Sequence, residues 1–130
     1  MTPEQIIARM SEQREAWVDL PTSLDAGGKA LSVRVVRPAE ADFGQYLKPA
    51  DDGQVVWSCT LDQVKSVVTG WRGFKESTLI RGGADDELTF APMLWHAWVA
   101  DHVAAAVPVA QRVVEMLAAH QLSAVDIEKN

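Results

Sequence analysis

The sequence predicts a mainly α-helical domain of the α+β class, with five or so helices, one short strand in the N-terminal half and a candidate small hairpin at residues 78–90. Two observations support this prediction. Apolar residues recur at helical spacing in several segments, most clearly over residues 92–122. Only residues 30–37 alternate apolar and polar side chains in the way that is typical of a strand.

The first helix is expected over residues 2–19. Thr2 is a favourable N-cap, and Gln5 lies at the position that completes a capping box. The apolar residues form only a thin stripe, so we expect this helix to pack weakly and to end at Pro21. The stripe consists of Ile6, Ile7, Met10, Trp17 and Val18.

The single expected strand covers residues 30–37, which are rich in β-branched valine. It follows a loop at residues 20–30. Pro38 ends the strand and opens a short helix over residues 38–47, because proline suits the first turn of a helix.

A further helix is expected over residues 60–70. Thr60 provides the N-cap, Gln63 completes a capping box, and Gly70 closes the helix. Residues 55–57 could instead form a strand, because β-branched valines precede a tryptophan there.

The C-terminal part of the chain is expected to be helical. Pro92 opens its first helix, and Pro108 predicts a break around residues 104–107, because proline lacks a backbone donor and clashes with the preceding turn. The last helix should then cover residues 107–122, and the tail at residues 123–130 is expected to fray.

The chain has the length of one domain. With 130 residues, we expect a single domain over residues 1–130 whose core lies in residues 30–122. We expect no signal peptide, and the longest apolar stretch, residues 103–110, is too short to cross a membrane. A lone cysteine excludes an intrachain disulfide and favours a reducing cytosol.

The net charge of −6 argues against nucleic acids and anionic membranes as partners. Such partners are recognised by dense basic surfaces. The densest basic stretch contains Arg34 and Arg37, with Lys29 nearby, and it is too sparse for this purpose.

No pattern of residues predicts catalysis, a metal site or a cofactor. The histidines His96 and His102 are too far apart in sequence to share a helix face as zinc ligands. Cys59 lies outside any nucleophile motif and is interpreted as a small buried residue. We therefore expect a binding protein rather than an enzyme, although a deep polar pocket joining a histidine to a carboxylate would favour a small enzyme.

Three segments, taken in their order along the chain, resemble a known family. They are the strand leading into R-P-x-x-A-D at Val33–Asp42, the element V-V-T-G-W-R-G-F at Val67–Phe74, and the motif L-T-F-A-P at Leu88–Pro92. Together they resemble the tail assembly chaperones of long-tailed bacteriophages, over roughly residues 30–120.

The resemblance implies a mostly helical protein of the host cytoplasm that is absent from the finished virion. Proteins of this family bind the long, aggregation-prone tape measure protein, keep it soluble and recruit tail tube subunits around it. A helical client with exposed apolar faces calls for apolar grooves and for several self-associated copies, so we expect a homo-oligomer. The alternative is another phage assembly module, such as a head–tail connector or a tail terminator.

The candidate contact residues for such a client are large apolar side chains on the expected helix faces. Aromatic residues dominate many protein interfaces, but they also pack in cores, and each candidate could serve the core instead. The candidates are Ile6, Met10, Trp17, Trp71, Trp95, Trp98, Val109, Val113 and Met116.

Overall fold

The computed structural model describes residues 1–24 and 28–129, with side chains described for residues 1–21 and 28–121. Helices account for 49% and strands for 23% of the structure, so the fold is α+β and the prediction of a mainly α fold is wrong. The elements are α1 (Pro3–Glu12), β1 (Glu15–Leu24), β2 (Ala30–Val36), the 3-10 helix η1 (Glu40–Tyr46), β3 (Leu47–Pro49), β4 (Val55–Trp57), α2 (Leu61–Val67), β5 (Val68–Arg72), α3 (Glu76–Leu79), α4 (Pro92–Ala100), the 3-10 helix η2 (Val103–Ala105) and α5 (Ala106–Lys129).

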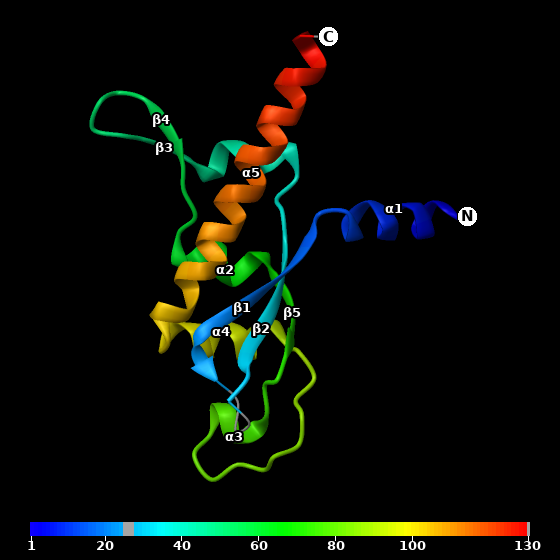
Figure 1. Cartoon of the computed structure of the whole chain (residues 1–130). Coiled ribbons are helices and arrows are strands. Elements are labelled where there is room, and N and C mark those ends of the chain that lie inside the picture. The colour runs from blue at the N-terminus through cyan, green and yellow to red at the C-terminus, as the bar shows by residue number, and fades with distance from the viewer. Residues whose placement is uncertain (25–27, 130) are drawn as a thin grey trace.

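The centre of the fold is a three-stranded antiparallel sheet in the order β1-β2-β5. Val33 on the central strand pairs with Val18 on β1 and with Trp71 on β5, and all three side chains are buried. The helices α2, α4 and α5 pack on one face of this sheet (Figure 1). The hydrophobic core therefore lies between the sheet and these three helices.

The second half of the expected first helix is a strand. α1 ends at Glu12 and β1 begins at Glu15, so the prediction of a helix over residues 2–19 fails beyond α1. From Ala16 to Leu20 the side chains alternate between packing on the core and facing outward, which is the period of a strand. Pairing with β2 buries the inward side chains, and this gain outweighs the weak helical stripe.

The remaining α1 begins with the predicted capping box. The Thr2 hydroxyl accepts a hydrogen bond from the Gln5 amide at 3.1 Å, and the Gln5 side-chain oxygen accepts one from the Thr2 amide at 2.9 Å. No residue of α1 is buried. The helix projects sideways from the sheet and the other helices (Figure 1).

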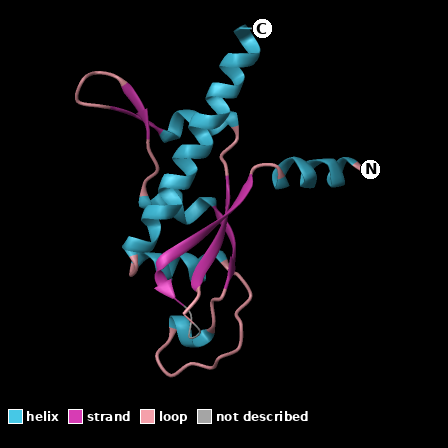
Figure 2. Ribbon diagram, in the orientation of Figure 1, coloured by secondary structure: helices cyan, strands magenta, loops and turns pink. Residues whose placement is uncertain are grey.

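The segment after β2 contains more strand and less helix than expected. The short helix expected over residues 38–47 is the 3-10 helix η1, which starts at Glu40. The alternative strand at residues 55–57 forms as β4 and pairs with β3. Figure 2 shows this two-stranded hairpin extending away from the three-stranded sheet.

The helix expected over residues 60–70 divides into α2 and β5. The predicted capping box of Thr60 and Gln63 is confirmed. The chain leaves the helix at Val68, which pairs with Val35 on β2, because β-branched residues favour the extended backbone and the partner strand is already present. Gly70 is therefore a strand residue rather than a helix terminus.

The candidate hairpin at residues 78–90 is a short helix followed by a loop. α3 occupies the start of this segment, and one isolated bridge between Lys75 and Glu87 closes the loop. The connection is longer than the turns that hold two strands in a tight hairpin.

The break between the C-terminal helices lies earlier than expected. α4 ends at Ala100, and α5 begins at Ala106 after the 3-10 helix η2. Pro108 thus lies in the first turn of α5, where a missing backbone donor costs nothing. The helix continues to Lys129, through the tail that was expected to fray, and projects beyond the other elements (Figure 1).

Candidate functional site

Five of the nine candidate contact residues are buried in the core. They are Trp71, Trp95, Trp98, Val109 and Val113. Met116 is half-buried and packs against the same core. The five buried side chains stabilise the fold rather than presenting a surface to a partner.

The buried tryptophans form one aromatic cluster around Phe74. The ring of Trp71 stacks on Phe74 with the centroids 4.3 Å apart, and the ring of Trp98 meets Phe74 edge-on at 5.1 Å. The indole nitrogen of Trp95 donates a hydrogen bond to the Val64 carbonyl at 3.4 Å. Aromatic pairs of this kind add about 0.5–1.5 kcal/mol each beyond the burial of their area. The tryptophan content of the chain therefore serves mainly the core.

The three sequence segments Val33–Asp42, Val67–Phe74 and Leu88–Pro92 meet around Trp71. Val33 of the first segment pairs with Trp71 of the second across the sheet. The Trp71 indole nitrogen donates a hydrogen bond to the Leu88 carbonyl of the third segment at 2.8 Å, and the Phe90 ring meets Trp71 edge-on at 5.3 Å. Segments that are distant in sequence thus form one contiguous structural unit.

The glycines of the second segment are explained by close packing. A Cβ atom on Gly70 would lie 3.3 Å from the Arg34 guanidinium, and one on Gly73 would lie 3.1 Å from a methyl group of Leu31. Gly73 also has a φ of 85°, in the left-handed region that favours glycine. The motif therefore has a folding role, and its residues carry no visible chemistry.

The remaining candidates, Ile6, Met10 and Trp17, are exposed. On α1, Ile6 is 47% exposed and Met10 is 59% exposed, and Ile7 between them is exposed as well. Trp17 lies on the outer face of β1, where the Arg72 guanidinium lies 3.6 Å from the centroid of its ring. The structure thus leaves an apolar patch on α1, defined by Ile6, Ile7 and Met10, and a separate aromatic residue on the sheet.

A groove lies where α1 joins the sheet. It consists of two hollows of about 660 Å³ and about 510 Å³ that share Ser11, Arg14, Arg37 and Ala39. Three arginines line the larger hollow, and Ile7 and Met10 of α1 line the smaller one. The basic residues are Arg14, which precedes β1, Arg34 on β2, and Arg37, which follows β2.

The three arginines are held by neutral groups. Arg34 donates to the hydroxyl and the carbonyl of Thr69 at 3.1 and 3.0 Å. Arg37 donates to the Pro38 carbonyl at 2.7 Å, and Arg14 donates to the Ser11 hydroxyl at 3.4 Å. Within the described part of the chain, none of the three guanidinium groups forms an ion pair with a carboxylate.

The larger hollow has three arginines and two carboxylates in its lining, and so a small excess of positive charge. Burial, reinforced by the positive charge of Arg14, lowers the pKa of Arg37, although Glu40 opposes this effect. Glu15 and Asp42 also line the larger hollow, but neither is paired with an arginine. A negatively charged group placed between the arginines would relieve the repulsion between their charges.

Sequence reasoning did not find this groove. In the sequence, Arg34 and Arg37 are too sparse to predict a nucleic-acid site, and Arg14 lies within the segment predicted to form the first helix. The end of α1 and the pairing of β1 with β2 bring Arg14 beside Arg37, whose amide donates to the Arg14 carbonyl at 2.8 Å. Arg34, a charged residue within a valine-rich strand, was the one local signal.

His102 contacts α4, and His120 lines the smaller hollow of the groove together with Glu40. The His102 ring stacks on Trp98 at 4.3 Å, and its Nδ1 atom lies 2.8 Å from the Trp98 carbonyl oxygen. A pocket containing His102 and Asp101 measures about 170 Å³, below the usual range of roughly 300–1,000 Å³ for ligand pockets. His120 lies 2.7 Å from a carboxylate oxygen of Glu40.

The Cys59 thiol is a weak nucleophile. Burial raises its pKa to about 11, so the thiol keeps its proton at neutral pH. In the described residues, no cluster of three or more histidine, cysteine, aspartate or glutamate side chains could hold a metal ion. Among the helices of the described residues, none combines the length and the apolar character that crossing a membrane requires.

Comparison of the chain with known protein families, curated proteins and solved structures finds no match.

Proposed function

We propose that this chain is a bacteriophage tail assembly chaperone that binds the tape measure protein in the host cytoplasm and promotes assembly of the tail tube. One observation carries the proposal. The three segments that resemble this family, Val33–Asp42, Val67–Phe74 and Leu88–Pro92, are not scattered matches, because they pack together around Trp71.

The exposed patch on α1 supports a holding role for this chain. A tape measure protein is expected to be a long helix with apolar faces, and it aggregates when these faces meet one another. Ile6, Ile7 and Met10 offer a matching apolar face on a helix with no buried residue. Grooves and helix faces bind amphipathic helices through anchors at such spacing. Ile6 and Met10 belong to the contact set expected from the sequence and are exposed, whereas the members of that set on α4 and α5 are buried or half-buried.

A single patch of this size binds weakly. Several copies of the chain along one long client would raise the overall affinity without any new contact, because each bound copy raises the local concentration of the next. We therefore propose a homo-oligomer that assembles on the client, recruits tail tube subunits and is absent from the mature virion.

Co-expression with the tape measure protein of the same phage tests the proposal. We expect the tape measure protein to stay soluble and to copurify with this chain, whereas an unrelated acidic protein of similar size leaves it in the pellet. Equal precipitation with and without this chain would refute the holding role. A stable ring that is also found in purified virions would instead identify a connector or a terminator.

A further inference from the structure

The groove beside α1 combines an apolar wall with a basic wall. Ile7 and Met10 line the hollow under α1, and Arg14 and Arg37 line both hollows. Arg34 extends the basic wall into the larger hollow. The arrangement is amphipathic along the length of the groove, from α1 to β2.

The guanidinium groups in this groove retain donors for a ligand. Each guanidinium carries five N–H donors. Arg37 uses one of them on the Pro38 carbonyl, and Arg14 uses one on the Ser11 hydroxyl. Guanidinium groups bind carboxylates through paired, charge-assisted hydrogen bonds, and no carboxylate of the described residues forms an ion pair with these three arginines, although Glu40 lines the smaller hollow.

We propose that this groove binds an acidic, amphipathic helix of a partner protein. A carboxylate of the partner is bound by Arg14, Arg34 and Arg37, and an apolar side chain on the next turn packs against Ile7 and Met10. The inference rests on the proposed chaperone function, because it names the surface on this chain and the chemistry of the client segment that it holds.

Two features favour a protein helix over a nucleic acid. Glu15 and Asp42 line the larger hollow and Glu40 lines the smaller one, so a continuous chain of phosphates would meet several fixed negative charges, whereas a helix can place one carboxylate at the arginines. The apolar wall of Ile7 and Met10 suits an aliphatic side chain and gives nothing to a phosphate backbone. A partner with isolated carboxylates fits both walls.

A fluorescein-labelled peptide tests the inference by fluorescence anisotropy. The probe is a helix of Ala, Leu and Glu, of about 15 residues, because shorter helices are marginal in water. Its leucines stand at helical spacing and its glutamates flank them. The control peptide carries glutamine in place of each glutamate, and a single-stranded DNA oligonucleotide of similar length represents a phosphate ligand.

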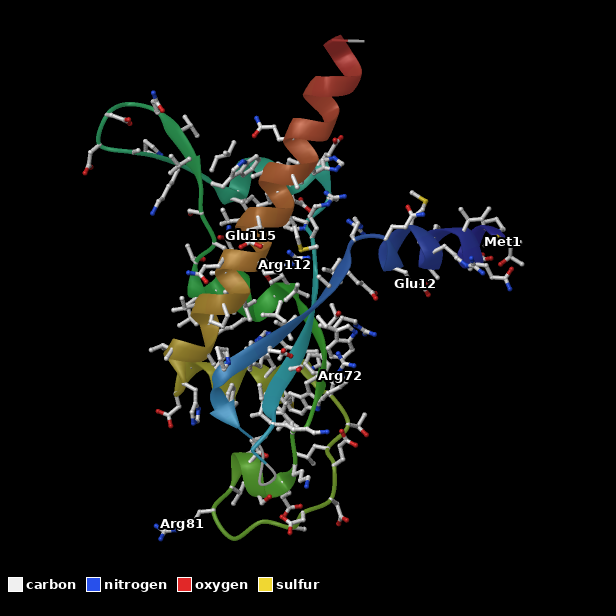
Figure 3. The ribbon with its side chains drawn as sticks, viewed as in Figure 1. Met1, Glu12, Arg72, Arg81, Arg112 and Glu115 are labelled. Carbon is white, nitrogen blue, oxygen red and sulfur yellow. The ribbon has the colours of Figure 1, made fainter. Side chains whose placement is uncertain are left out.

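The protein variants are chosen as a matched set. Arg14→Gln and Arg37→Gln each remove one charge from the groove. Arg81→Gln removes the same charge from an exposed loop position far from α1 (Figure 3). Circular dichroism and thermal unfolding of each variant establish that it folds before binding is measured.

We expect the acidic peptide to bind the unmodified chain, and Arg14→Gln or Arg37→Gln to weaken binding about tenfold, as for the loss of a hydrogen bond between charged groups. The Arg81→Gln variant should bind the acidic peptide as the unmodified chain does. The glutamine peptide should bind the unmodified chain no more tightly than the groove variants bind the acidic peptide. Met10→Ser should weaken both peptides.

Four results would overturn the inference: no binding of the acidic peptide, equal losses for Arg37→Gln and Arg81→Gln, tighter binding of the oligonucleotide, or a groove-dependent dimer that excludes the peptide. Each is read from the peptide assay or from sedimentation, and so is separate from the co-expression test. If the chain keeps the tape measure protein soluble but fails the peptide assay, the groove proposal is refuted and the proposed chaperone function stands.

Discussion

The indole nitrogen of Trp71 donates a 2.8 Å hydrogen bond to the backbone carbonyl of Leu88. This bond joins the last strand of the sheet to the segment that leads into α4. Phe90 adds an edge-on ring contact at 5.3 Å to the same indole. The Trp71 side chain therefore anchors the C-terminal end of the loop between β5 and α4, together with the backbone hydrogen bond from the Leu88 amide to the Phe74 carbonyl at 2.9 Å.

Replacing Trp71 by phenylalanine should destabilise the protein by about 1–3 kcal/mol. The change removes the donor and leaves the Leu88 carbonyl without this partner, while an aromatic ring can still stack on Phe74. Urea unfolding followed by circular dichroism measures the effect. Trp98→Phe is the matched control, because the Trp98 indole nitrogen has no hydrogen-bond partner among the described residues. Equal losses for the two variants would contradict the role assigned to the bond.

Gly73→Ala should cost more stability than Gly82→Ala. Both glycines have a φ near 80°, so alanine at either position is strained by the left-handed backbone, which destabilises the protein by about 1–2 kcal/mol. Only at Gly73 would the new methyl group approach another side chain, Leu31, at 3.1 Å, whereas nothing lies within 4 Å at Gly82. Leu31 is buried and cannot move freely. Chemical unfolding of both variants gives the difference, and an equal loss would show that strain alone acts at Gly73.

Local sequence signals predicted the elements that depend on nearby residues. The capping boxes at Thr2 and Thr60 form as expected, because each involves residues three positions apart. The strand at residues 30–36 was also visible from its own alternation. β1 and β5 were missed because their sequences also fit a helix, and they become strands only through pairing with β2, which no local pattern reveals.

The candidate site was predicted only in part for a related reason. A stripe of apolar residues looks the same whether it faces a core or a partner, and only the packing of α4 and α5 on the sheet shows that Trp95 and Val109 face inward. The basic groove depends on the turn after Glu12, which carries Arg14 to Arg37. No spacing pattern in the sequence predicts that Arg14 and Arg37 lie side by side.

Cys59 should react slowly with thiol reagents in the folded protein. Because burial raises its pKa to about 11, only about one thiol in a thousand is ionised at pH 8. The reaction rate with 5,5′-dithiobis(2-nitrobenzoic acid) should rise with pH up to about 11, and the urea-unfolded chain should react far faster at pH 8. Equal rates for the folded and unfolded chains at pH 8 would contradict protection of the half-buried thiol by the fold.

The raised pKa of Cys59 also predicts how the stability of the fold changes with pH. The unfolded thiol loses its proton at about pH 8.5, before the folded one does. The contribution of Cys59 is thus fully present below that pH and is lost as the pH rises toward about 11. Cys59→Ala should remove this part of the decline, which urea unfolding at several alkaline pH values measures against the unmodified chain. An identical decline in both proteins would assign it to other groups.

The apolar patch on α1 should matter for the client and not for the fold. Ile6→Gln combined with Met10→Gln exchanges exposed side chains on a helix without buried residues, so the free energy of unfolding should change by about 0.5 kcal/mol or less. The amount of soluble tape measure protein on co-expression should fall markedly, because these side chains provide the contact area. Val107→Gln is the control, since Val107 is 53% exposed on α5, outside the patch. If the double variant keeps the client soluble as well as the Val107 control does, α1 is not the holding surface, and the client contact must lie elsewhere on the chain.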